Sequence, residues 1–181
     1  QDIQAHITQR EIGRDCPDFP SALRRALRHD PDVVLVGEMR DRDTISLALT
    51  AAETGHLVFA TLHTSSASQC PERIVDVFPA GQQEQVRLQL SESLQGILSQ
   101  ILVDRTDGGL VPAQEILVAN DAVRALIRER KTPQLYNVLQ TGGREGMRTL
   151  ESSLNEYVAA GIVTHEIAVR NANLPEQILR R

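Results

Sequence analysis

Two short apolar runs with a helical pattern between them constrain the fold of this chain more than any other feature. The first run is Val33–Val36, and the second extends from Leu57 to Leu62. Between them, the sequence predicts a helix that begins at Asp43 or Thr44 and ends near Thr54. The order strand, helix, strand predicts a right-handed βαβ unit in an α/β fold. Fully apolar runs of this length are typical of parallel strands that are covered on both faces.

The composition excludes several classes of protein. The 181 residues are 41% hydrophobic and 24% charged, which is an ordinary globular balance. A net charge of -5 provides no basic surface for general nucleic-acid binding, so no nucleic-acid partner is expected. No apolar run approaches the ~20 residues that cross a bilayer, and the first residues do not resemble a signal peptide. Two separated cysteines, Cys16 and Cys70, argue against a disulfide framework and a structural zinc site, and fit a cytosolic protein.

Further elements are predicted on both sides of the βαβ unit. Turn residues and caps separate them, as the positions of glycine, proline and aspartate indicate. They are a short strand over residues 3–7, a helix from Ser21 to Arg28, a long amphipathic helix from about Gln82 to Leu102, short strands at 101–103 and 111–118, and helices from about residues 121, 133, 147 and 166. A boundary near residue 119 is expected to divide a sheet-bearing domain, residues 1–119, from a helical C-terminal subdomain, residues 120–181.

Charged side chains follow the first apolar run directly. Glu38 comes after a glycine that lets the backbone turn, and Arg40 stands beside it. Ligands of open α/β sheets bind beyond the carboxyl ends of the strands. A carboxylate at that edge can hold Mg²⁺ through water or orient a hydrolytic water, and an arginine can contact phosphate. The alternative is that Glu38 is an ordinary exposed residue after a core strand.

The second apolar run is bracketed by His56 and His63, and hydroxyl residues follow it. If the two strands are parallel neighbours, His63 and Thr64 emerge at the same sheet edge as Glu38, where an imidazole or a hydroxyl can hydrogen-bond a γ-phosphate. Alternatively, His56 caps the preceding helix, and Thr64 or Ser65 caps the next one. The two strand-end clusters together favour a nucleotide site, whereas each alone is ambiguous.

Three segments resemble the type IV pilus retraction ATPases (PilT-like) of the type II/IV secretion ATPase superfamily. The segment Ala22–Asp41 resembles their Walker B region, and Leu49–Thr64 resembles their histidine box. The segment Ala122–Glu129 is similar to the C-terminal motif that this family uses in retraction. The resemblance extends over nearly the whole chain.

This resemblance implies a RecA-like (P-loop NTPase) core and a homohexameric ring. In that ring, Mg²⁺-dependent hydrolysis of ATP would power pilus retraction and twitching motility. It implies a cytoplasmic motor, peripheral to the bacterial inner membrane, that acts on a pilus platform protein embedded there. Glu38 would be the Walker B acid, catalytic together with His63 and bound to Mg²⁺ through water. The nucleotide-binding residues would be His56, Arg40 and Thr64, and the coupling motif would comprise Ala122, Arg124, Leu126, Ile127, Arg128 and Glu129.

The chain also departs from the family pattern. It lacks the N-terminal PAS-like domain, the acidic box and the Gly-rich loop with its Lys and Ser/Thr. That loop provides much of the positioning and charge stabilisation in phosphoryl transfer, so we expect the isolated chain to be inactive although its parent protein hydrolyses ATP. The two separated cysteines cannot form the four-cysteine zinc insertion of many secretion and extension relatives, which favours the retraction branch.

Three alternatives remain at this stage. The chain could be a non-catalytic oligomerisation or interaction module, whose helical C-terminal part mediates ring contacts or docks on a membrane-embedded platform protein. It could belong to another branch of the type II/IV secretion ATPases. A metal-dependent hydrolase that uses Glu38, His56 and His63 is disfavoured, because the two histidines bracket one strand and point to its opposite ends.

Overall fold

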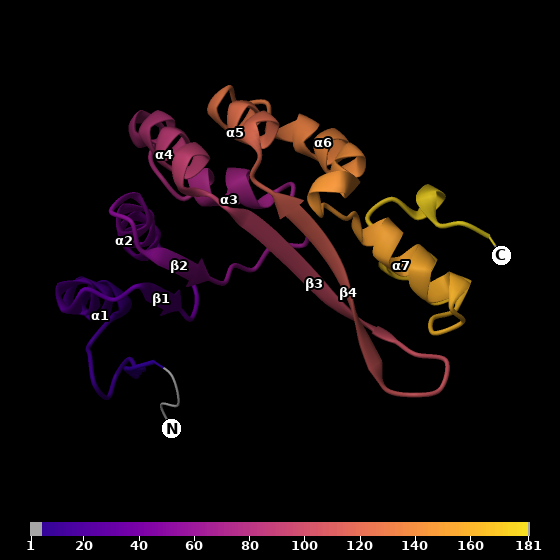
Figure 1. Ribbon diagram of the computed structural model, residues 1–181, viewed down its shortest axis with the longest axis horizontal. Coiled ribbons are helices and arrows are strands. Elements are labelled where there is room, and N and C mark those ends of the chain that lie inside the picture. Colours follow the sequence, from indigo (N-terminus) through magenta and orange to yellow (C-terminus); the bar gives the residue numbers. More distant parts are fainter. Residues whose placement is uncertain (1–4, 181) are drawn as a thin grey trace. The chain divides into compact units, whose positions relative to one another are not determined.

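A computed structural model describes residues 5–180, and the chain divides into two compact units, Gln1–Leu62 and His63–Arg181. The first unit contains the predicted βαβ arrangement and the second contains a long hairpin with helices (Figure 1). The expected domain boundary between residues 119 and 120 stays a prediction. Within the second unit, strand β4 (Leu110–Val118) packs against helix α7 (Leu150–Ala159), so elements from both sides of that boundary share contacts.

The first unit is built on two parallel strands. Strand β1 (Val33–Val36) pairs with β2 (Leu57–Ala60) in parallel, with Val36 opposite Ala60. Helix α2 (Arg42–Glu53) connects them, and helix α1 (Phe19–Ala26) with the short 3₁₀ helix η1 (Leu27–His29) precedes β1. The predicted strand–helix–strand order is therefore confirmed.

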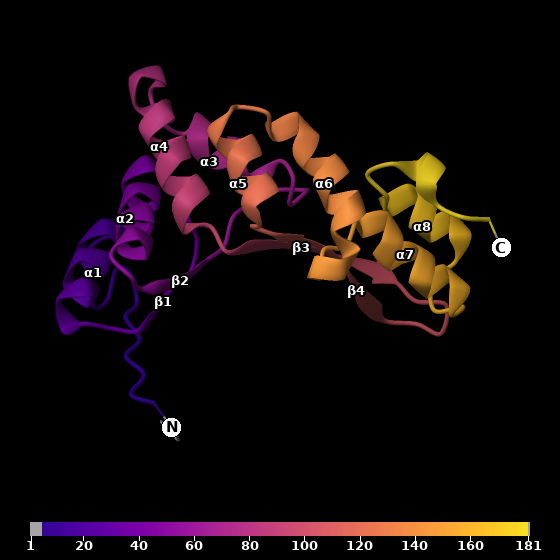
Figure 2. The same cartoon turned by 45° about the horizontal axis from the view of Figure 1, so that its top comes forward.

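Among the described residues of the first unit, helices cover one face of the β1–β2 pair and leave the other exposed. Val34 and Val36 are buried against Leu23 of α1, and Leu47 of α2 packs against the same cluster. Figure 2 shows α1 and α2 beside the two strands. Leu35 and Phe59, which point to the other face, are 74% and 55% exposed. The prediction that both faces are covered is wrong for this unit, because α1 and α2 contact the same side of the strands.

Local sequence signals predicted the start of α2 only approximately and predicted a strand near the beginning of the first unit that residues 5–7 do not form. Helix α2 is capped by Asp41, whereas the sequence pattern predicts Asp43 or Thr44 as the cap. Of the strand predicted over residues 3–7, Ile3 lies outside the described residues, and residues 5–7 have no strand structure.

The second unit begins with two helices and a hairpin. Helices α3 (Cys70–Asp76) and α4 (Ala80–Ser93) lead into strand β3 (Gly96–Asp104), which pairs antiparallel with β4. Gly108 and Gly109 form the connecting turn, with φ angles of +92° and +79° that glycine adopts without strain.

The long helix predicted from Gln82 to Leu102 is wrong beyond Ser93. Leu94 is extended, and the residues after it form β3. Short apolar segments fit a helix or a strand equally well by spacing. Pairing with β4 along all of β3 decides in favour of the strand, on which Leu98 and Leu102 point outward and are more than half exposed.

Short helices complete the second unit. After the hairpin, side chains cap the first, third and fourth α-helices of this unit. The capping residues are, in that order, Asn120, Thr149 and Thr164. The elements are α5 (Asp121–Arg128), η2 (Thr132–Gln134), α6 (Leu135–Thr141), η3 (Gly142–Glu145), α7, α8 (His165–Asn171) and η4 (Pro175–Gln177). Among residues 5–180, none of the helices has both the length and the apolar character needed to cross a membrane.

Candidate functional site

Glu38 lies at the carboxyl end of β1, as the sequence predicts. Its side chain is 28% exposed, and its Oε2 accepts a bond of 2.7 Å from Nε of Arg40. The side chain of Arg40 is 70% exposed. The structure therefore brings these two predicted residues together, with a half-sheltered carboxylate next to an accessible guanidinium.

The backbone on both sides of Glu38 is bonded to the end of the neighbouring strand. The amide of Met39 donates to the carbonyl of Thr61 over 2.9 Å. The hydroxyl of Thr61 in turn donates to the carbonyl of Gly37. Sequence reasoning missed Thr61 as a positioning residue, because Thr61 lay inside the predicted run from Leu57 to Leu62, whereas β2 ends at Ala60.

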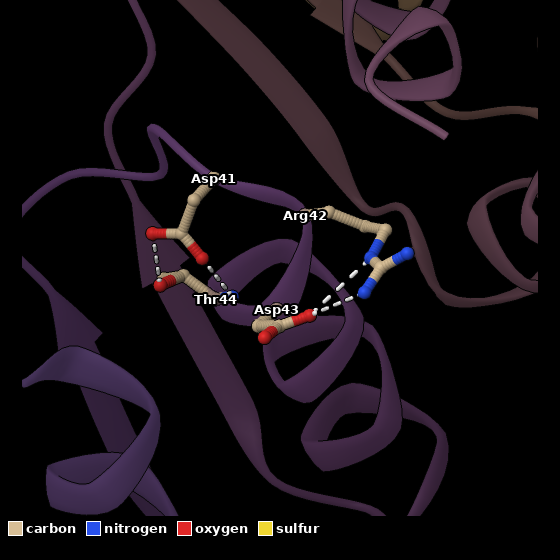
Figure 3. A network of polar contacts seen from close by, with 4 residues as sticks. All are labelled: Asp41, Arg42, Asp43 and Thr44. Carbon is tan, nitrogen blue, oxygen red and sulfur yellow. Dashed lines mark hydrogen bonds and ion pairs between the residues drawn. The ribbon is translucent and has the colours of Figure 1, made fainter. Parts of the chain in front are cut away.

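Asp41 fixes the start of α2 shortly after Glu38. Its Oδ1 accepts the Thr44 amide and its Oδ2 accepts the Thr44 hydroxyl, each over 2.8 Å (Figure 3). The bond from the Thr44 amide holds the pKa of the Asp41 carboxyl below its usual value. The neighbouring acid, Asp43, pairs instead with Arg42 at the surface. Glu38 is therefore held between a strand end and a capped helix.

His56 lies at the opposite end of the strand pair from Glu38. It precedes β2, where the amide of Leu57 donates to the carbonyl of Asp32. Its Nδ1 is 3.0 Å from the carbonyl of Ala51 and 3.1 Å from the hydroxyl of Thr54, both near the end of α2. These contacts match the helix-capping alternative. The structure does not bring His56 and Glu38 together, and a role of His56 in nucleotide binding stays a prediction.

His63 and Thr64 belong to the second unit, so their juxtaposition with Glu38 stays a prediction. Burial raises the pKa of the Cys70 thiol to about 11, and the Thr64 side chain acts in the opposite direction. Helix α3 has Gln69 at its N-cap, without a side-chain bond. The alternative in which Thr64 or Ser65 caps the next helix is therefore wrong.

The loop that follows Thr64 contacts a charged residue that sequence reasoning missed. Glu115, on β4, is 1% exposed and accepts hydrogen bonds from Ser66 and Ala67. A signal for it was present in the strand pattern, because Glu115 shares the inward face of β4 with Ala113 and Leu117. A charge in such a row needs hydrogen-bond partners.

The predicted coupling motif falls on α5, and its residues have different surroundings. Ile127 is fully buried. Nη1 of Arg124 donates to the carbonyls of Ser91 and Glu92, at 2.8 and 2.7 Å, which ties α5 to the end of α4. The remaining members are half-buried or exposed, namely Ala122, Leu126, Arg128 and Glu129.

Comparison with known families shows which protein family the chain belongs to. The family model described as Type II/IV secretion system protein matches residues 3–144. The chain belongs to this family. Among the proteins that it resembles are pilus ATPases and components of type II secretion systems.

Two curated members of the secretion family match almost the whole chain. The type IV pilus retraction ATPase PilT of Pseudomonas aeruginosa is 55% identical over 170 residues, which cover 94% of this chain and 49% of the relative. A twitching motility protein of Neisseria gonorrhoeae is 54% identical over 179 residues, which cover 98% of this chain and 48% of the relative. The chain thus spans about half the length of the curated relatives it matches.

Solved structures of the family share the fold. The crystal structure of the pilus retraction motor PilT with bound ADP matches with a TM-score of 0.86 and 49% identity, over 94% of this chain and 48% of that one. The Legionella pneumophila ATPase DotB matches with a TM-score of 0.82 and 31% identity, over 93% of this chain and 46% of that one. The predicted membership of the secretion ATPase superfamily and the predicted α/β fold are confirmed.

Proposed function

We propose that this chain is the Walker B and histidine-box part of a hexameric motor that hydrolyses Mg-ATP and retracts type IV pili. The observation that carries the proposal is the placement of Glu38 at the carboxyl end of β1, in a chain 55% identical to a retraction ATPase. The ADP bound to the related retraction motor PilT supports a nucleotide as the ligand.

Each predicted site residue has a role in this proposal. Glu38 binds Mg²⁺ through water and orients the attacking water, and His63 assists at the γ-phosphate. Arg40 and Thr64 contact nucleotide oxygens, whereas His56 lies at the opposite end of the strand pair, beside the end of α2. ATP and Mg²⁺ are the cofactors of the parent protein, which would supply the phosphate-binding loop.

The proposed assembly is a homohexameric ring at the cytoplasmic side of the inner membrane. Helix α5 transmits the motion of the ring to a membrane-embedded pilus platform protein. A second candidate is an ATPase of another secretion branch, which the likeness to DotB at 31% identity supports.

The decisive variant is Glu38→Gln in the full-length protein that carries this chain. The amide keeps the shape of Glu38 but cannot act as a base or hold Mg²⁺-bound water as strongly. We expect kcat to fall by about 10²-fold or more, with ATP affinity largely retained. Phosphate release and binding of a fluorescent ATP analogue measure the two effects.

The matched control is Asp43→Asn, which neutralises an exposed carboxylate that pairs with Arg42. It should hydrolyse ATP at the wild-type rate. Normal hydrolysis by the Glu38→Gln protein would sink the assignment of Glu38 as the Walker B acid.

A further inference from the structure

Glu115 occupies an inward position of β4, where a charge is unexpected. The residues on the same face, Ala113 and Leu117, are fully buried, and Glu115 is 1% exposed. Burial of an ionised carboxylate is strongly unfavourable unless hydrogen bonds replace the lost water. The partners of this carboxylate therefore indicate its purpose.

Most of these partners come from one loop. Oε1 of Glu115 accepts the hydroxyl of Ser66 at 2.8 Å, the amide of Ala67 at 2.6 Å and the amide of Ser68 at 3.4 Å. Nδ2 of Asn173 is 3.5 Å from Oε2. Three consecutive residues of the loop thus converge on one oxygen atom.

This loop has little freedom to move away from the carboxylate. Ala67 is fully buried, and Ser66 is 5% exposed. If the loop moved, the carboxylate would lose its donors inside the protein, and the two loop amides would lose their acceptor. Glu115 and the loop therefore hold each other in place.

We propose that Glu115 is a positioning residue that presents His63 and Thr64 to the nucleotide. Residues 66–68 follow His63 and Thr64 closely along the chain and lie in the same compact unit. By fixing the path of the chain after Thr64, Glu115 fixes where these side chains leave the loop. The inference rests on the proposed ATPase function and adds a residue from the hairpin to it.

A second buried carboxylate in the same unit provides a matched comparison. Glu151 is also 1% exposed, and its oxygens accept the hydroxyl of Tyr136 at 3.0 Å and the amide of Leu174 at 2.9 Å. These partners lie in α6 and in the C-terminal segment, outside residues 66–68. A general effect of neutralising a buried acid should appear at Glu151 as well, whereas an effect on the loop should appear only at Glu115.

The test uses Glu115→Gln in the full-length protein. Glutamine keeps an acceptor oxygen but loses the charge that strengthens the three bonds. We expect kcat for ATP hydrolysis to fall about tenfold, the factor that corresponds to about 1.4 kcal/mol, with ring assembly unchanged. In a His63→Ala background the same change should lower kcat less than about twofold, because residues that act as a unit are not additive.

The control, Glu151→Gln, should leave kcat within about twofold of the wild-type value. This holds even if Glu151→Gln lowers the melting temperature as much as Glu115→Gln does. Hydrogen exchange of the peptide that contains Ala67 should speed up in Glu115→Gln and stay unchanged in Glu151→Gln. If Glu115→Gln alters stability but neither kcat nor the exchange of this peptide, the positioning role is wrong.

A milder pair of variants covers the case in which Glu115→Gln does not fold. Ser66→Ala removes one of the loop donors and should lower kcat about threefold. Ser153→Ala changes another buried serine, whose Oγ accepts the Gln114 amide at 3.1 Å. This control variant should leave kcat unchanged. Equal rates in both would overturn the inference. If the wild-type protein itself hydrolyses no ATP, the proposed function fails, and the exchange measurement still decides whether Glu115 holds the loop.

Discussion

A few short-range polar contacts fix the backbone around Glu38. Thr61 bonds to the residues on both sides of it, and Asp41 caps the helix that follows. These residues do not carry the proposed chemistry themselves. They remove the freedom that a carboxylate on a loop after a strand would otherwise have, which is what a preorganised site requires.

At this scale, the capping role of Asp41 leads to a prediction for stability. Asp41→Ala removes the acceptor of the Thr44 amide and should lower the free energy of unfolding by about 1 kcal/mol at neutral pH. Asp43→Ala, which removes an exposed acid from the same turn without breaking a cap, should lower it less. Urea unfolding followed by circular dichroism measures both, and equal losses would contradict the capping role.

The pH dependence of the same cap can be checked with Asp41→Asn, which keeps an acceptor oxygen but does not titrate. The pKa of Asp41 is lowered in the folded state, so its ionised form adds stability above its unfolded value of about 3.9. That stability is lost as the pH falls through the lowered value. The wild type should therefore lose more stability than Asp41→Asn in this acidic range.

At the scale of elements, the predicted coupling motif on α5 has both sheltered and exposed positions. Ile127 and the Arg124 bonds to the end of α4 belong to the packing of the second unit. Arg128 and Glu129 are exposed at the end of the helix. This exposed part of the predicted coupling motif has no role in the core, and we propose it as the part that a partner contacts.

Variants at the tethered Arg124 and at the exposed Arg128 should therefore separate the proposed coupling role from folding. Arg128→Glu, which reverses an exposed charge, should reduce pilus retraction while leaving ATPase activity and melting temperature near wild type. Arg124→Ala, the matched structural variant, should lower the melting temperature because the carbonyls of α4 lose their donor. Twitching zones, phosphate release and thermal melts measure the three properties. A strictly proportional loss of retraction and hydrolysis in Arg128→Glu would show that the motif has no separate coupling role.

At the scale of the whole molecule, the chain spans about half the length of the relatives it matches. It contains the segments that we propose as Walker B and histidine box, but its sequence has no Gly-rich loop followed by Lys and Ser/Thr. Much of the charge stabilisation in phosphoryl transfer comes from that loop. The apolar face that Leu35 and Phe59 expose on the β1–β2 pair is uncovered within its own unit.

We therefore predict that the purified 181-residue chain does not hydrolyse ATP at a useful rate. A sensitive phosphate-release assay with and without Mg²⁺ checks this, with the full-length protein as the positive control. The prediction is wrong if the 181-residue chain hydrolyses ATP in the presence of Mg²⁺ and the variant Glu38→Ala abolishes that hydrolysis. The phosphate-binding loop would then be dispensable.

Local patterns in the sequence determined the βαβ unit, the place of Glu38 at a strand end and the resemblance to retraction ATPases. These depend on apolar runs, glycines and strand-end charges that lie close together along the chain, so no long-range information is needed to recognise them. The separate position of His56, at the amino end of β2, also follows from its place directly before the strand.

The tertiary structure alone decided the elements and roles that depend on distant partners. Residues 96–104 have a spacing that suits a helix, and only the ladder to β4 makes them a strand. The strand pattern places Glu115 on the inward face of β4, but its partners Ser66 and Ala67 come from far along the chain and meet it only in the folded protein. In both cases the structure is stabilised by contacts between segments that are remote in sequence. Local residue spacing does not reveal which remote segments will meet.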